Sequence, residues 1–281
     1  MSEHRPALEH IQAYADHLRL EEKSAATVEK YLRDVRAFAR WLEGREITKE
    51  RTAAWKTHLV ERGYAPASVN AMLSALNSLL DFLGFGDCRV KFLKVQRRMF
   101  RDDSRDLTRS DYNALTAAAK AQNKTRLALL MEAICATGIR VSEVQYITVE
   151  AARAGRAEVA LKGKIRTILI PSKLCRKLLK YAKQQKTASG EIFLTRNGTP
   201  LSRRQIWAEM KGLCKTAGVA ASKVFPHNLR HLFAAAFYRA SRDIVKLADV
   251  LGHSSIETTR IYLLTSGAEH QRQLDRLGLV S

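Results

Sequence analysis

The chain has 281 residues, enough for two domains that each bury a core, and its hydrophobic content of 46% is that of a globular protein. An excess of 48 Lys and Arg over 28 Asp and Glu gives a formal net charge of +20. That charge favours nucleic acid as a partner, with a ribosome-associated or simply soluble basic protein as the alternative. No apolar run approaches the ~18 residues of a membrane span, and the N-terminus lacks a signal-peptide core. We therefore expect a cytoplasmic protein with no membrane contact.

The first 85 residues have the apolar periodicity of four helices joined by short loops. These helices are expected to start near Leu8, Ser24, Thr48 and Ala65. From residue 84 to about 106 the periodicity is lost and charges are mixed, as in a linker. We place a helical domain at residues 1–96 and the linker itself at 97–106. The second domain starts at 107, with Thr108 or Ser110 capping its first helix.

Residues 107–281 are predicted to be mainly helical, with one small β element. Strands at 158–161 and 166–170 flank a turn at 162–165 that contains Gly163, which is typical of a hairpin. Residues 192–194 are a candidate third strand. Further helices are expected at about 202–217, 227–240 and 242–251. The fold class is therefore mainly α (α+β).

Arg140 lies in the segment ATGIRVSE. A guanidinium holds two phosphate oxygens through parallel hydrogen bonds and keeps its charge at any physiological pH. Glu143 is three residues further on, which places it on the same helical face, where it could orient Arg140. A surface Arg–Glu pair is the alternative for this segment taken alone.

His227 and Arg230 lie three residues apart in HNLRH, so a proton-transfer group and a second phosphate clamp share one helix face. Pro226 immediately before them suits a helix N-terminus, whose amides also favour phosphate. The alternative is a metal pair formed by His227 and His231. Zinc needs a third ligand with suitable spacing, and the sequence offers no HExxH motif or cysteine pair. We expect no metal and no cofactor.

His253 follows Arg230 by 23 residues in LGHSS, and Tyr262 follows His253 by nine. Taken singly, such a histidine usually belongs to a turn and such a tyrosine is usually packing. The ordered series of Arg, Lys, His-x-x-Arg, His and Tyr, however, supplies a nucleophile, permanent cations and proton-transfer groups. It contains no carboxylate cluster for a metal. This is the set of groups needed to attack a DNA phosphodiester with a tyrosine.

The segments ATGIRVSE, HNLRH and LGHSSIETTRIY resemble the three strongest motifs of the tyrosine recombinases, also called the phage integrase family. The chain is most similar to the short Xer-type recombinases, and residues 1–96 resemble their core-binding, SAM-like domain. Lys162 falls at the position of the family's catalytic lysine. The hairpin KGKIR is one residue shorter than the common GKGxKxR pattern, so Lys164 is the alternative.

The resemblance implies cleavage by Tyr262 through a 3′-phosphotyrosyl intermediate, without metal or ATP. The other catalytic positions that it implies are Arg140, Lys162, His227, Arg230 and His253, with Glu143 in support. It further implies a partner, double-stranded DNA recombination sites, on which four protomers assemble. The expected DNA contacts are Arg97, Arg98, Arg101, Lys164, Lys173, Arg203 and Arg204. For Lys173 a solvated helix face is the alternative.

Two other functions use similar features. A type IB topoisomerase uses the same chemistry to relax DNA without joining two sites, and the compact Xer-like layout argues against it. A DNA-binding regulator would need the helices and the charge but not a complete catalytic set. The sequence therefore favours a site-specific recombinase acting in DNA integration, excision or chromosome-dimer resolution.

Overall fold

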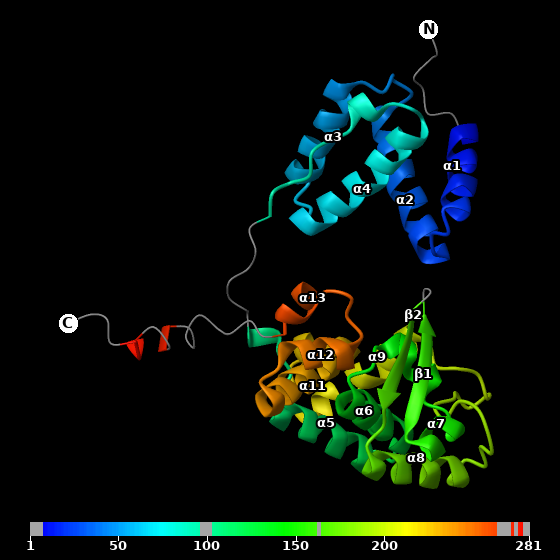
Figure 1. Ribbon diagram of the computed structural model, residues 1–281, viewed down its shortest axis with the longest axis vertical. Coiled ribbons are helices and arrows are strands. Elements are labelled where there is room, and N and C mark those ends of the chain that lie inside the picture. The colour runs from blue at the N-terminus through cyan, green and yellow to red at the C-terminus, as the bar shows by residue number, and fades with distance from the viewer. Residues whose placement is uncertain (1–7, 96–102, 162–163, 263–270, 273–274, 278–281) are drawn as a thin grey trace. The chain divides into compact units, whose positions relative to one another are not determined.

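The computed structural model describes residues 8–95, 103–161, 164–262, 271–272 and 275–277 (Figure 1). The chain divides into two compact units, Met1–Arg97 and Arg98–Ser281, here called the N-terminal and C-terminal units. No helix among the described residues is long and apolar enough to cross a membrane.

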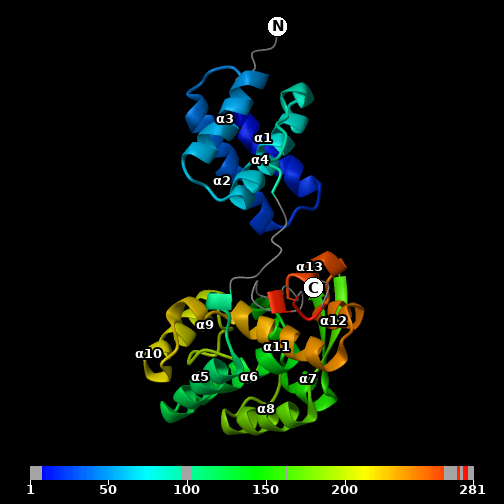
Figure 2. The ribbon, with the colours of Figure 1, turned by 90° about the vertical axis from the view of Figure 1, so that its left-hand side faces the viewer.

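The N-terminal unit consists of the four predicted helices, which are confirmed (Figures 1 and 2). They are α1 Leu8–Leu20, α2 Ala25–Leu42, α3 Lys49–Glu61 and α4 Pro66–Phe82. The Thr48 side chain accepts from the backbone N–H of Arg51 and so caps α3, while Pro66 occupies the first turn of α4. Helix α4 lies against the other three helices. Three leucines of its apolar stripe, Leu73, Leu76 and Leu80, are fully buried.

The chain after α4 remains part of this unit, so the expected loss of structure from residue 84 is wrong for its first part. A short 3-10 helix, η1 Gly86–Cys88, follows α4, and Cys88 and Val90 are buried in the core. The Asn77 side chain bonds both the N–H and the C=O of Val90, at 2.9 Å each. Asn70 does the same for Leu93. The two asparagine side chains thus supply the hydrogen-bond partners that the backbone of this extended segment would otherwise lack.

The C-terminal unit is built around α6 (Thr125–Thr137), which lies against α5, α8, α9 and α11 (Figure 2). The other α-helices are α5 Arg109–Ala121, α7 Val149–Ala154, α8 Ser172–Gln184, α9 Arg203–Lys211, α10 Cys214–Ala217, α11 Pro226–Ser241, α12 Ile244–Leu251 and α13 Ile256–Arg260. The 3-10 helices are η2 Asp103–Arg105, η3 Val141–Tyr146 and η4 Ala221–Lys223. Thr108, one of the two predicted caps, caps α5, and it forms a reciprocal capping box with Asp111. The predicted helix at 202–217 is two helices, because α9 ends at Gly212 and α10 is a separate turn.

The β element is an antiparallel hairpin of β1 (Arg156–Leu161) and β2 (Lys164–Leu169). Residues 162–163 connect the strands, so the predicted four-residue turn is wrong, and Lys164 and Ile165 belong to β2. Side chains alternate across the strands. Val159 and Ile168 are buried, whereas Ile165 is 78% exposed. Arg166 pairs with Val159, and its side chain therefore lies on the buried face.

The predicted third strand at 192–194 is also wrong. The described residues form only isolated bridges there, Thr148 with Glu191 and Leu194 with Pro200. Ile192 and Phe193 are buried in the core, so their apolar character reflects packing rather than strand pairing.

Candidate active site

Arg140 is positioned by a sharp change of direction after α6. The helix ends at Gly138, whose φ of 67° is the left-handed conformation. A Cβ on Gly138 would lie 2.4 Å from the ring of Phe233, so no other residue fits there without displacing α11 or the ring. Arg140 then has extended backbone and is the N-cap of η3. The expectation that Arg140 and Glu143 share a helical face is therefore wrong, although the two side chains do meet.

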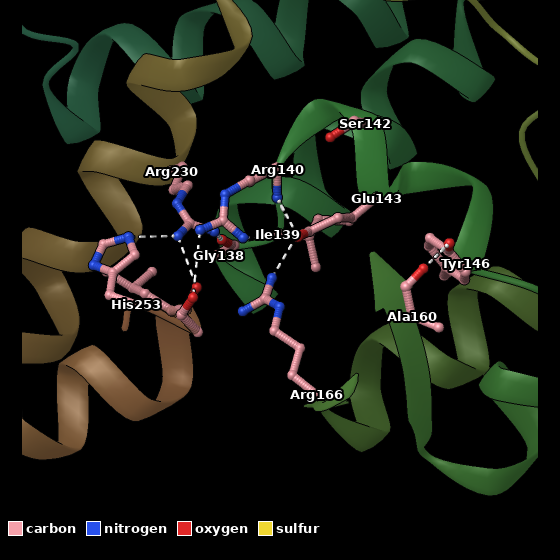
Figure 3. Close-up of polar contacts among 12 residues, drawn as sticks. Gly138, Ile139, Arg140, Ser142, Glu143, Tyr146, Ala160, Arg166, Arg230 and His253 are labelled. Atoms are coloured by element: carbon pink, nitrogen blue, oxygen red, sulfur yellow. Dashed lines mark hydrogen bonds and ion pairs between the residues drawn. The ribbon is translucent and has the colours of Figure 1, made fainter. Parts of the chain in front are cut away.

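Glu143 is a buried carboxylate, 1% exposed, that binds two arginines (Figure 3). Its Oε1 accepts from Nη1 of Arg140 at 2.8 Å, and its Oε2 accepts from the backbone N–H of Arg140 at 2.7 Å. Oε2 also accepts from Nη2 of Arg166. Burial alone would raise the pKa of Glu143, but these donors outweigh it and hold the pKa below its usual range. Glu143 is thus ionised and fixes both guanidiniums.

Arg230, on α11, is only 1% exposed and joins three segments of the unit. Its Nη1 donates to the carbonyl of Gly138 at 2.5 Å, and its Nη2 donates to the carbonyl of Leu251 at 2.8 Å. Its Nε lies 3.4 Å from the hydroxyl of Tyr262. Burial lowers the pKa of Arg230, and the tyrosine hydroxyl partly opposes this. A guanidinium nevertheless stays charged in proteins, so a permanent cation faces the tyrosine oxygen.

His253 is a neutral imidazole whose tautomer follows from its partners. Nη2 of Arg230 lies 2.9 Å from its Nε2, and because a guanidinium can only donate, Nε2 accepts. The proton is then on Nδ1, which donates to Oγ1 of Thr259 at 2.8 Å. Burial, followed by the positive charges of Arg230 and its neighbours, lowers the pKa of His253 to about 4. The preceding Gly252, with φ of 63°, makes the turn out of α12.

Tyr262 follows α13 and is 5% exposed. Its ring is stacked on His253, with centroids 5.7 Å apart and planes inclined by 11°. The ring of His231 is closer, at 4.3 Å, and that of His227 lies at 6.2 Å. Three histidines from two segments therefore surround the phenol. His227, near the start of α11, lies on the same side of the tyrosine as His231, with ring centroids 4.7 Å apart.

These side chains line one cleft of about 830 Å³ in the C-terminal unit. The sequence-predicted residues that it brings together are Arg140, Glu143, Arg203, His227, Arg230, His253 and Tyr262. The cleft combines a phenol, fixed cations and imidazoles, which are the groups that nucleophilic attack on a phosphodiester requires. Among the described residues, no group of three or more His, Cys, Asp or Glu side chains could hold a metal ion.

Of the other predicted contacts, Arg204 and Lys173 are described and do not line this cleft. Lys162, Arg97, Arg98 and Arg101 lie outside the described residues, and Lys164 is described only as the first residue of β2. Arg204 is exposed on α9 beside Arg203. Lys173 lies on α8, at the opposite end of the C-terminal unit from α13 (Figures 1 and 2).

Sequence reasoning did not assign a role to Arg166, His231 or Thr259, which also contact the site. Arg166 lies in the hairpin motif itself, and a turn of two or of four residues places it on the same face of the hairpin. Its role was missed because its partners, Glu143 and Val250, lie on other segments of the chain. His231 was considered only as a metal ligand. No sequence signal identifies Thr259, because its contact with His253 depends on how α13 packs.

Comparison with known proteins agrees with this geometry. The model of the phage integrase family matches residues 105–268, and that of the phage integrase N-terminal SAM-like domain matches residues 11–84. Tyrosine recombinase XerA of Thermococcus kodakarensis is 29% identical, covering 97% of this chain and 95% of that protein. Tyrosine recombinase XerD of Brucella suis is 31% identical, covering 86% and 88%.

Two solved structures show the same fold. A lambda integrase dimer bound to a COC′ core site superposes with a TM-score of 0.72 at 20% identity, covering 91% of this chain and 94% of that one. The crystal structure of XerA recombinase gives a TM-score of 0.53 at 22% identity, covering 95% and 97%. The matches to the two family models and to the recombinases cover nearly the whole chain. The protein therefore belongs to the phage integrase family and is a tyrosine recombinase.

Proposed function

We propose that the protein cuts and rejoins DNA at specific sites through attack of the Tyr262 hydroxyl on a scissile phosphodiester. The observation that carries the proposal is the distance of 3.4 Å between that hydroxyl and Nε of Arg230, in a cleft that Arg140 also lines. A phosphate held by the arginines would meet the nucleophile of the same protomer. Attack forms a bond from the tyrosine oxygen to phosphorus and releases the 5′-hydroxyl, leaving a 3′-phosphotyrosyl protein. The bond energy is conserved, so rejoining requires no ATP.

Arg140 and Arg230 would hold the two non-bridging oxygens. The pentacovalent state carries one more negative charge than the phosphodiester, and fixed cations stabilise it without reorganising. Arg140 is suited to this because Glu143 fixes its guanidinium from behind while 41% of its side chain stays accessible. Loss of one such donor typically costs about 10²–10³ in rate.

The proton transfers fall to the remaining groups. His227 would accept the tyrosine proton as general base, and Lys162, with Lys164 as the alternative, would protonate the leaving 5′-oxygen. Neutral His253 accepts a hydrogen bond from Arg230, so in the free protein it orients that arginine. A bound phosphate brings negative charge that raises the pKa of a neighbouring histidine. His253 would then gain a proton and donate to the phosphate.

The proposed partner is double-stranded DNA, bound by a homotetramer on two recombination sites in the cytoplasm. Solved neighbours include a lambda integrase tetramer bound to a Holliday junction and the XerH recombinase bound to its difH substrate. The net charge of +20 supports the same partner. Arg203 and Arg204 start α9, where arginines could contact phosphates or read guanine edges. Arg97, Arg98, Arg101, Lys164 and Lys173 are the further proposed DNA contacts.

The test uses nicked duplexes from the DNA flanking the protein's own gene, incubated in EDTA and run on denaturing gels. Wild type should form a covalent protein–DNA adduct, and Tyr262→Phe should form none while binding the same DNA. Tyr64→Phe, at an exposed tyrosine of the N-terminal unit, is the matched control and should behave as wild type. An adduct with Tyr262→Phe would refute the nucleophile. Tight binding without any adduct would favour the regulator, and relaxation of a plasmid without strand exchange would favour the topoisomerase.

A further inference from the structure

Arg166 binds two parts of the cleft that lie far apart in sequence, and Figure 3 shows its contact with Glu143. Its Nη2 binds Oε2 of Glu143, the same oxygen that accepts from the backbone of Arg140. Its Nη1 donates to the carbonyl of Val250 at 3.1 Å, just before the turn that carries His253. The side chain reaches both because β2 places it on the inner face of the hairpin.

The fit around Arg166 is tight. A Cβ on Gly252 would lie 2.3 Å from its Cδ and 2.9 Å from its Nη1, so the arginine stem fills the space that any other residue at 252 would occupy. The side chain is 15% exposed. Gly252, in the turn between α12 and α13, is therefore packed against a residue of β2.

The Nε of Arg166 is buried and has no hydrogen-bond partner among the described residues. A buried donor without a partner is destabilising, and such groups are rare in folded proteins. Stability alone therefore does not explain an arginine at this position. One of its two bonds ends on Glu143, which fixes Arg140, and the other ends on the Val250 carbonyl, three residues before His253.

We propose that Arg166 is a positioning residue for the reaction, acting through Glu143 on Arg140 and through the Val250–Gly252 turn on His253. The inference rests on the proposed function. Arg166 itself need not touch DNA, because its two bonded nitrogens point at a carboxylate and a carbonyl. Without it, Glu143 would keep its two bonds from Arg140 but lose its third donor and the charge that Arg166 places beside Oε2. Displacement of about 1 Å in a phosphate-binding group is enough to slow catalysis by about 10²-fold.

The experiment measures single-turnover cleavage of the nicked duplex by the full-length protein, with DNA affinity and the thermal midpoint measured in parallel. The variants are Arg166→Gln, Arg166→Lys and, as matched control, Arg156→Gln, an exposed arginine at the other end of the same hairpin. Each is also tested on a duplex whose scissile phosphate is replaced by an uncharged methylphosphonate. Cleavage of that substrate depends less on the position of the guanidiniums, because a methyl group replaces one charged non-bridging oxygen.

Both Arg166 variants should cleave the phosphodiester roughly 10- to 100-fold more slowly than wild type, with unchanged DNA affinity. Most of that deficit should disappear on the methylphosphonate. Three results would overturn the inference. The first is a wild-type rate for Arg166→Gln, and the second is a wild-type rate for Arg166→Lys, which would mean that charge alone matters. The third is an equal deficit on both substrates, which would mean a general loss of structure. If wild type and Arg156→Gln also fail to cleave, the proposed function itself fails, and the inference with it.

Discussion

Replacing Glu143 by Gln tests whether one carboxylate organises the phosphate-binding cleft. The carboxylate accepts three hydrogen bonds, two at Oε2 from the Arg140 backbone and Arg166, and one at Oε1 from the Arg140 side chain. A glutamine has one acceptor oxygen. Placed at the Oε2 position it keeps two bonds, but its NH₂ group then faces the guanidinium of Arg140, donor against donor.

The size of the expected loss of unfolding free energy depends on whether each arginine can reach water once the carboxylate is gone. Removing one partner of a buried ion pair costs about 3–5 kcal/mol, because the other charge stays buried. Arg166, with 15% of its side chain exposed, would be such a buried charge without its partner. Arg140 is 41% exposed and can turn to water, which returns part of the loss. We therefore expect the C-terminal unit of Glu143→Gln to lose about 2–4 kcal/mol of unfolding free energy, and cleavage to slow about as much as on loss of one arginine.

Urea-dependent hydrogen exchange of peptides from α6 measures this unit alone, since α6 is the centre of its core. Glu158→Gln, an exposed glutamate on β1, is the control and should change the unfolding free energy by less than about 0.5 kcal/mol. A loss below about 1 kcal/mol for Glu143→Gln would refute the reasoning, because it would mean that the carboxylate is not buried against charge. Normal cleavage by a destabilised Glu143→Gln variant would refute only the role of Glu143 in orienting Arg140.

Two further predictions concern the turn at His253. The pKa of about 4 lies below the usual 6.5, so the unfolded chain binds the proton more tightly and stability falls as pH drops from about 6.5 to 4. After allowing for partial exposure, wild type should lose about 1–2 kcal/mol more unfolding free energy than His253→Gln between pH 7 and 4.5. Urea unfolding at the two pH values measures this difference. Equal losses would contradict a buried neutral imidazole. Gly252→Ala combines left-handed strain with displacement of Arg166, whereas Gly155→Ala, at φ of 70° with no described atom within 4 Å of the added Cβ, has the strain alone. Both should lose about 1 kcal/mol or more of stability, but only Gly252→Ala should slow cleavage, by tenfold or more; equal rates in the two variants would mean that the packing of Arg166 does not matter.

Helices were the part of the fold that sequence predicted best, because their signals are local. The apolar spacing of α1 to α4, the Thr48 and Thr108 caps and Pro66 each act within a turn or two of chain. The segment after α4 was misjudged because its partners are side chains on that helix. Nothing in residues 89–93 indicates that Asn70 and Asn77 supply their hydrogen bonds.

The site shows the same division between local and long-range information. The motifs identified the groups that share the cleft, but not how they are held. Arg140 was expected on a helix and instead caps one, because Gly138 ends α6 two residues earlier. Arg166 was expected in the second strand, but its role went unassigned because its partners, Glu143 and Val250, are 23 and 84 residues away in sequence.

Burial, together with the charges of the cleft, keeps His253 neutral, and donors from two arginines keep Glu143 ionised. Among the described residues that line it, four are arginines, and Glu143 is the single carboxylate. A phosphodiester brings one negative charge and its pentacovalent state two, so the surplus of cations matches the transition state better than the empty cleft. In the free protein that surplus is unfavourable. It adds to the effect of burial in lowering the affinity of His253 for a proton, and it makes the Glu143 carboxylate necessary. The cleft is therefore assembled for an anion that arrives with the DNA, and proton uptake by His253 on DNA binding is the physical consequence to expect.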